Sequence, residues 1–295
     1  MVPAEIFRKV RQIEISTSRL VMDTFAGEYH SVFKGQGMEF HEVRPYSPGD
    51  EIRSIDWNVT ARMGDPFVRR YHEERELSVM LVIDASGSAD FGSVSRFKRD
   101  LATELAAVLS FAATNNNDRV GLLIFTDRME LLIPPRKGRR HVLRLIRDML
   151  VFEPKSIGTN IRLALDTINL VLQRHSIVFL ISDFLADPES YRRAMAVTNR
   201  RHDVVAIDIH DPMEEEIADV GLLLLEDAET GELRSVDTSS KRWRNSFAEQ
   251  VRRFQAAKME VLTNSKVDRI SITTEHDYVA GLTKFFKQRA RRLSR

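Results

Sequence analysis

The sequence predicts an α/β protein whose core is a doubly wound, mostly parallel β-sheet with helices on both faces. The first observation is that apolar strands alternate with helical segments from Leu77 onward, as in sheets whose parallel strands are joined by helices. The second is that these strands are apolar throughout rather than at every other residue, which is typical of strands buried on both faces. Clusters of turn residues separate the elements.

Residues 4–25 are expected to form a helix, because apolar side chains recur at helical spacing between Arg and Lys. Residues 28–76 are rich in Gly and Pro, with short apolar and aromatic pieces between them. This pattern predicts loops and short strands that wrap onto a larger body. We therefore divide the chain into an N-terminal helix and wrapping segment, residues 1–76, and a core domain, residues 77–295.

The core domain is expected to alternate strands and helices in chain order. Strands are predicted at residues 77–84, 118–126, 176–183, 203–211 and 268–274. Helices are predicted at residues 96–116, 138–152, 159–175, 188–201, 241–263 and 276–294. Residues 220–238 predict a hairpin with Thr-Gly in its turn.

Composition excludes several classes of protein. The 295 residues are 43% hydrophobic and 29% charged, which is ordinary for a globular chain and unlike a disordered one. The absence of cysteine excludes disulfides, thiolate catalysis, zinc fingers and iron–sulfur clusters. The longest apolar runs are far shorter than the roughly 20 residues that span a bilayer, and the first residues have no signal-peptide character. We expect a cytoplasmic protein without a membrane span.

Charge argues against a general nucleic-acid binder. Lys and Arg number 44 and Asp and Glu 43, a net charge of +1. Two basic clusters, at residues 136–140 and 284–295, are interpreted as solvated helix faces. Nucleic-acid binding through the basic tail is kept as a less favoured hypothesis, and steep salt dependence would reveal it.

Polar residues gather where the predicted strands end. Asp84, Ser86 and Ser88 follow the first core strand, Asp183 ends a later strand, and Thr159 lies beside a glycine in a loop. Ligands of open α/β sheets bind beyond the carboxyl ends of the strands, so these oxygens are expected to converge. A set of carboxylates and hydroxyls without His or Cys selects Mg²⁺, Mn²⁺ or Ca²⁺.

The Asp-x-Ser-x-Ser pattern is suggestive rather than decisive by itself, because ~0.1 chance occurrences are expected in a chain of this composition. A structural alternative is that Asp84 and the serines fill a turn and cap the next helix. Their position at the end of an apolar strand, together with Thr159 and Asp183, favours the metal site.

The five residues resemble the metal-ion-dependent adhesion site of von Willebrand factor A domains, whose ligand positions are matched by Asp84, Ser86, Ser88, Thr159 and Asp183. Upstream motifs resemble the signature of a bacterial family, domain of unknown function fifty-eight. These motifs are KGQGMEF at 34–40, RPYSPGD at 44–50, IDW at 55–57 and AR at 61–62. The sequence departs from that family after Ser88, where Ala89-Asp90-Phe91-Gly92 stands in a place that often holds Met.

The resemblance implies a von Willebrand factor A-like domain and, as partner, a MoxR-type AAA+ ATPase, in a chaperone-like system that matures or activates a client protein complex. It leads us to expect a non-enzymatic interaction module whose Mg²⁺ (or Mn²⁺ or Ca²⁺) captures an acidic residue of the partner. No catalytic residue is assigned, and the partner-binding residues are not identified. The alternative is a Mg²⁺-dependent phosphohydrolase with Asp84 as nucleophile, although Ser86 stands where such enzymes place a second Asp, which leaves no general acid.

Overall fold

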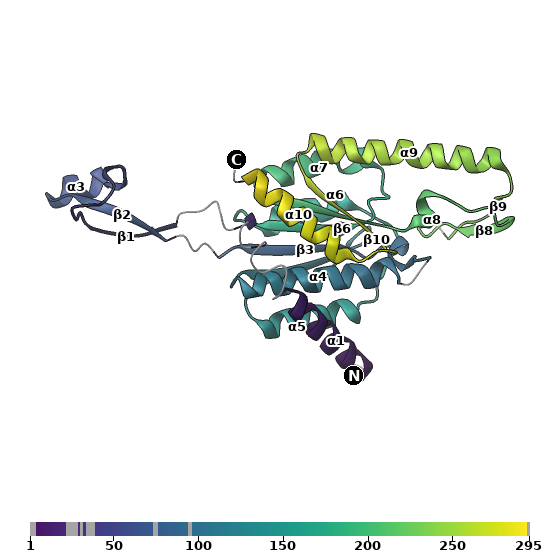
Figure 1. The fold of residues 1–295 in the computed structure, drawn as a ribbon, viewed down its shortest axis with the longest axis horizontal. Helices are drawn as coiled ribbons and strands as arrows, with labels where there is room; N and C mark the ends of the chain where they lie inside the picture. Colours follow the sequence, from purple (N-terminus) through teal and green to yellow (C-terminus); the bar gives the residue numbers. More distant parts are fainter. Residues whose placement is uncertain are drawn as a thin grey trace.

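A six-stranded sheet forms the centre of the molecule, in the strand order β10-β7-β6-β3-β4-β5. The computed structural model describes residues 4–21, 29, 32–33, 39–72, 76–93, 96–229 and 231–293. Neighbouring strands are parallel except for β5, which is antiparallel to β4. This arrangement confirms the predicted doubly wound, mostly parallel sheet (Figure 1).

The elements follow one another in the predicted alternation. The strands of the central sheet are β3 (Ser78–Asp84), β4 (Arg119–Phe125), β5 (Met129–Arg136), β6 (Ile177–Ser182), β7 (Asp203–His210) and β10 (Asp268–Thr273). The helices around them are α1 (Ala4–Leu20), α4 (Lys98–Asn115), α5 (Arg139–Leu150), α6 (Ile161–Val171), α7 (Pro188–Arg201), α8 (Pro212–Glu215), α9 (Lys241–Asn264) and α10 (Tyr278–Leu293), with a 3₁₀ turn, η3 (Gly87–Asp90), after β3. The predicted hairpin is present as β8 (Leu222–Glu226) and β9 (Leu233–Asp237).

Helices cover both faces of the sheet, and alternate residues of β3 illustrate why. Val79, Leu81 and Ile83 belong to a core shared with α1, α4, α5 and α10. Met80 and Val82 point to the opposite face and belong to a core shared with α6, α7 and α9. Because both sides of the strand are buried, apolar residues are needed at every position. Among the helices in the described ranges, none is long and apolar enough to cross a membrane.

The edge strand β5 was not predicted from the sequence. Pro134 and Pro135 lie near the end of this strand. Proline within an apolar run argues against a central strand, because it cannot donate a ladder hydrogen bond. In the structure β5 pairs on one side only, with β4. An edge position tolerates the missing donors, so the strand forms despite the prolines.

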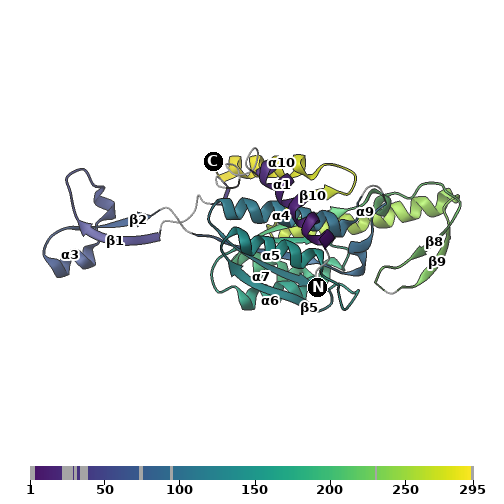
Figure 2. The ribbon, with the colours of Figure 1, turned by 90° about the horizontal axis from the view of Figure 1, so that it is seen from below.

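The N-terminal segment is divided between two places. Helix α1 packs beside α4 and α5, and Tyr29 and Phe33 lie in the core, with the Phe33 ring 5.9 Å from that of Phe179. Residues 39–72 instead form a separate lobe that stands apart from the sheet (Figures 1 and 2). We expected these residues to wrap onto the core domain, but residues 39–72 form this lobe instead. Residues 22–25 of the predicted N-terminal helix and residues 34–38 of the KGQGMEF motif lie outside the described residues.

The lobe consists of an antiparallel pair, β1 (Glu39–Pro45) and β2 (Phe67–His72), with η2 (Ile52–Ser54) and α3 (Trp57–Met63) between them. The Asp56 carboxylate accepts hydrogen bonds from the backbone N–H groups of Asn58 and Val59, which starts α3. Arg44 binds both carboxylate oxygens of Asp50 at 2.8 and 2.6 Å. These contacts fix the turns of the lobe.

A buried histidine makes the stability of the core sensitive to acid. His202 is 2% exposed, and neither ring nitrogen finds a hydrogen-bond partner among the described residues. Burial, and then the positive charges of Arg201 and His175, lower the pKa of His202 to about 4. The unfolded chain binds a proton on this ring near pH 6.5, so between pH 6.5 and 4 protons favour the unfolded state.

We expect the free energy of unfolding to fall by about 2.5 kcal/mol on this account as the pH drops from 6.5 to 4. His202→Leu should remove that part of the pH slope, because no proton can then bind in the unfolded state. Urea unfolding across this pH range measures the slope. The exposed His276 provides a matched control, since His276→Leu should leave the slope unchanged. An identical slope in wild type and His202→Leu would contradict the prediction.

Candidate functional site

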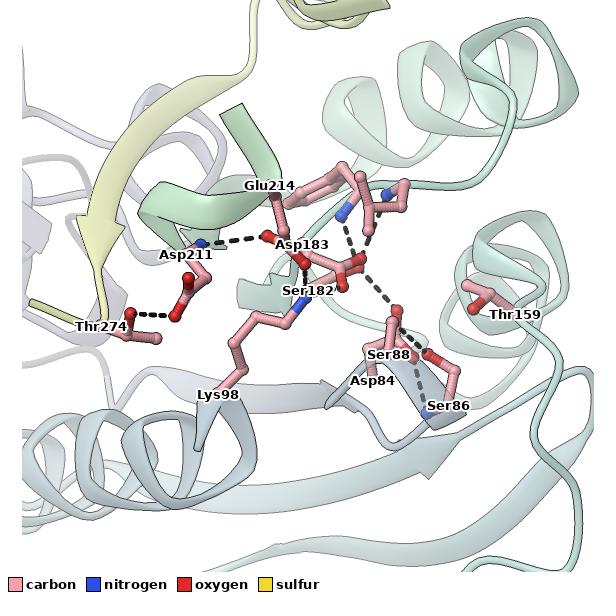
Figure 3. A network of polar contacts seen from close by, with 12 residues as sticks. Asp84, Ser86, Ser88, Lys98, Thr159, Ser182, Asp183, Asp211, Glu214 and Thr274 are labelled. Carbon is pink, nitrogen blue, oxygen red and sulfur yellow. Dashed lines mark hydrogen bonds and ion pairs between the residues drawn. The ribbon is translucent and has the colours of Figure 1, made fainter. Parts of the chain in front are cut away.

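The candidate site lies at the carboxyl edge of the sheet, where β3 and β6 end side by side (Figure 3). Asp84 is the last residue of β3 and Ser182 the last of β6. The Ser182 hydroxyl donates a hydrogen bond to Asp84 Oδ2 at 2.7 Å, and the backbone N–H of Ser86 donates to Asp84 Oδ1 at 3.0 Å. These two bonds aim the Asp84 carboxylate at the space above the strand ends.

The two predicted serines join Asp84. The chain turns sharply after β3, and Ser86 and Ser88 lie at the start of η3 with their hydroxyl oxygens 3.2 Å apart. Both side chains are buried. Three of the five residues singled out in the sequence, Asp84, Ser86 and Ser88, are thus brought together as predicted.

Asp183 is held by a lysine that the sequence analysis did not identify. Lys98 Nζ lies 2.6 Å from Asp183 Oδ2 and 2.5 Å from Glu214 Oε1, and its side chain is only 3% exposed. Figure 3 shows the ammonium group between the two carboxylates. One signal was available in the sequence, because Lys98 lies at helical spacing from Leu101, on the apolar side of α4.

The charges of the site perturb one another. Burial, and then the negative charge of Asp183, raise the pKa of Asp84 to about 6. Burial by itself lowers the pKa of Lys98, but the charges of Asp183 and Glu214 outweigh it and hold that pKa above its ordinary value. Burial raises the pKa of Glu214, and Lys98 opposes this effect. Asp84 is the carboxylate whose ionised form is least compensated, so a cation beside it would stabilise that form.

Thr159, the fifth predicted residue, forms its hydrogen bond with a residue outside the Asp84 cluster. Its hydroxyl donates a hydrogen bond to Glu229 Oε1 at 2.7 Å. In Figure 3 its side chain lies to one side of the Asp84 cluster, without a drawn contact to it. Glu229 belongs to the β8–β9 connection, far away in sequence, and no sequence pattern linked it to the site.

A second buried cation, Lys258, contacts the backbone that carries Asp183. Lys258 Nζ lies 2.9 Å from Asp208 Oδ2 and 3.4 Å from the backbone carbonyl oxygen of Asp183. Arg269 also binds Asp208, at 2.6 Å. This network joins α9, β7 and β10 to the end of β6 and so fixes the backbone that carries Asp183.

The chemistry of the cluster suits a hard divalent cation. A cavity of about 20 Å³, room for about one water-sized particle, lies beside the cluster. Its lining combines polar and apolar residues: Asp84, Ser88, Lys98, Ser182 and Asp183 with Ala89, Ala102, Ile181 and Ile209. Carboxylate and hydroxyl oxygens are ligands that Mg²⁺, Mn²⁺ and Ca²⁺ accept. Within the described part of the chain, no three His, Cys, Asp or Glu side chains converge as a metal site. The candidate therefore depends on serine hydroxyls, which fit beside Asp84, whereas Asp183 and Thr159 have other partners here.

The fold and the site define the class. The chain has a doubly wound, mostly parallel α/β fold with an oxygen-rich cluster at the carboxyl edge of its sheet. It belongs to the family described as Protein of unknown function DUF58, whose model matches residues 42–257. Uncharacterized protein Mb1516 of Mycobacterium bovis is 32% identical over 286 residues, which cover 96% of this chain and 89% of that protein.

Two solved structures are similar to this chain at low sequence identity. The conserved hypothetical protein BatB from Bacteroides thetaiotaomicron is 14% identical with a TM-score of 0.50, and the match covers 73% of this chain and 99% of BatB. The SpRpn10 VWA domain is 13% identical with a TM-score of 0.40, over 72% of this chain and 97% of that domain. At these identities the likeness to BatB concerns the fold alone.

Proposed function

We propose that this chain is a non-enzymatic protein-interaction module that binds a divalent cation, Mg²⁺ or else Mn²⁺ or Ca²⁺, and through it captures an acidic residue of a partner. The observation that carries the proposal is the convergence of the Asp84, Ser86 and Ser88 oxygens at the edge of the sheet. Only one of these groups is charged, so a bound divalent cation would keep net positive charge and an open coordination position for a carboxylate.

Each residue of the site has a distinct part in this proposal. Asp84 supplies the negative charge, and the Ser182 hydroxyl holds its carboxylate in place. Ser86 and Ser88 supply neutral oxygens. Asp183 and Thr159 would complete the set, which requires Asp183 to share its carboxylate with Lys98 and Thr159 to leave Glu229.

As partner we propose a MoxR-type AAA+ ATPase, with this chain as its adaptor in the maturation or activation of a client complex. Family membership supports this pairing, because the resemblance stated above implies it. The net charge of +1 gives no reason to add nucleic acid as a ligand.

The competing proposal is a Mg²⁺-dependent phosphohydrolase with Asp84 as nucleophile. Such chemistry needs a general acid to protonate the leaving group. The residue two positions after Asp84 is Ser86, and the carboxylates nearest to it in the network, Asp183 and Glu214, are bound to Lys98. The arrangement supports binding better than hydrolysis.

The direct test is binding between this chain and a MoxR-type ATPase, measured by surface plasmon resonance in Mg²⁺ and in EDTA. We expect binding in Mg²⁺ that EDTA abolishes, because the partner's carboxylate is captured through the cation. Hydrolysis of p-nitrophenyl phosphate in Mg²⁺ should stay at the level of buffer. Mg²⁺-independent binding would contradict the role of the cation, and Asp84-dependent hydrolysis would favour the phosphohydrolase.

A further inference from the structure

The tip of the β8–β9 hairpin lies on the loops that carry the candidate site. We use "hairpin tip" for Asp227, Ala228, Glu229 and Gly231. Thr159 donates its hydroxyl hydrogen bond to Glu229 at 2.7 Å. A Cβ on Gly87, between the two serines of the site, would collide with the backbone carbonyl of Ala228. The tip therefore touches both the serine turn and the Thr159 loop.

The tip presents its carboxylate in a fixed direction. The backbone N–H of Glu229 donates to Asp227 Oδ1 at 3.0 Å, and that of Gly231 donates to the Asp227 carbonyl at 2.7 Å. Bonds that an Asp side chain and carbonyl accept from the N–H groups that follow stabilise a tight turn. Glu229 is therefore an acidic residue on an ordered turn, which is the chemistry expected of the proposed partner.

The hairpin is not part of the central sheet. Among the described strands, β8 and β9 pair with each other alone and form a sheet separate from the central one. Both views show the hairpin beyond the end of the body opposite the β1–β2 lobe (Figures 1 and 2). Its base is pinned, because Thr238 binds the Gly221 carbonyl and Arg244 lies 3.1 Å from Asp219. A two-stranded hairpin on such a base can act as a hinge unit, since isolated hairpins are only marginally stable.

We infer that the hairpin tip is an internal competitor for the partner-binding face: Glu229 occupies Thr159 until an acidic segment of the partner displaces the tip. This inference rests on the proposed function and adds to it the regulation of the same site. Glu229 is exposed and makes a single hydrogen bond to Thr159, so the closed state is favoured only modestly. If only the open molecules bind the partner, its apparent affinity equals the intrinsic affinity multiplied by the fraction of molecules that are open.

Opening the tip should strengthen partner binding. We expect Glu229→Ala to bind a MoxR-type ATPase in Mg²⁺ about 3- to 10-fold more tightly than wild type by surface plasmon resonance. The matched control is Glu226→Ala, which removes the same charge from the same hairpin at a position with no recorded contact to Thr159. That variant should bind like wild type. Equal affinity of wild type and Glu229→Ala overturns the inference.

Closing the tip should block binding. The natural chain has no cysteine, so Ile157→Cys/Ala228→Cys provides the only two thiols, at positions that both lie against Gly87. Joining them with a short bismaleimide should remove ATPase binding, and the unjoined double variant should retain it. Full binding by the joined protein would overturn the inference.

The contact itself can be tested without a partner. In hydrogen exchange, the amides of the hairpin tip should exchange faster in Glu229→Ala than in wild type or Glu226→Ala, because the tip is released. Unchanged exchange contradicts the inference and leaves the proposed function standing. If the tip is released but neither wild type nor Glu229→Ala binds the ATPase, the proposed function fails and the inference about the partner fails with it.

Discussion

Replacing Asp84 with alanine is expected to abolish divalent-cation binding and partner binding while the protein stays folded. Among the described residues no cationic side chain is paired with Asp84, whereas Asp183 forms an ion pair with Lys98. The fold should survive, because burial already disfavours the ionised carboxylate, as its raised pKa records. Removing that charge relieves an unfavourable group and costs mainly two hydrogen bonds.

Electron paramagnetic resonance of Mn²⁺ measures this directly. Wild type should bind Mn²⁺ with sub-millimolar affinity, and the ion at ten times its Kd should raise the free energy of unfolding by ~1.4 kcal/mol. Asp84→Ala should show neither effect. Asp90→Ala is the matched control, because Asp90 is nearby but exposed and bound to Arg99. Equal Mn²⁺ binding in Asp84→Ala would refute the site, and unfolding of that variant would show that Asp84 is structural.

Replacing Lys98 with methionine is expected to lower the free energy of unfolding by about 3–5 kcal/mol. The substitution leaves Asp183 and Glu214 without the buried ammonium that lies between them, and breaking a buried pair from one side costs roughly this much. Mg²⁺ should restore part of the loss, because a divalent cation can then use the Asp183 carboxylate that Lys98 occupies in wild type. Mg²⁺ should therefore stabilise Lys98→Met more than it stabilises wild type.

Lys9, in helix α1, provides the control. Lys9 lies 2.8 Å from Asp100, a residue of the same helix α4 that carries Lys98. The side chains of Lys9 and Asp100 are 54% and 38% exposed. Lys9→Met should cost less than about 1 kcal/mol, since exposed ion pairs contribute little. Urea unfolding of wild type, Lys98→Met and Lys9→Met, each with and without Mg²⁺, measures these free energies. A cost for Lys98→Met no larger than that for Lys9→Met would show that the buried pair does not stabilise the site.

The sequence determined the central architecture because its signals are local. Strands such as β3 are apolar at every position, and this periodicity follows directly from burial on both faces. The grouping of Asp84, Ser86 and Ser88 was predictable for the same reason, since all three belong to one strand end and one turn. A local pattern failed at β5, where the two prolines argued against a strand that an edge position allows.

Only the tertiary structure decided what surrounds that cluster. Lys98 comes from α4, Glu214 from α8 and Glu229 from the β8–β9 connection. Lys98 joins Asp183 to Glu214, and Glu229 meets Thr159, through packing between segments far apart in the sequence. The separation of residues 39–72 as a lobe was equally invisible, because Gly- and Pro-rich segments specify turns but not the surface on which they rest. The sequence thus determined which oxygens end the central strands, and the tertiary structure decided which charges face them, because those charges come from distant parts of the chain.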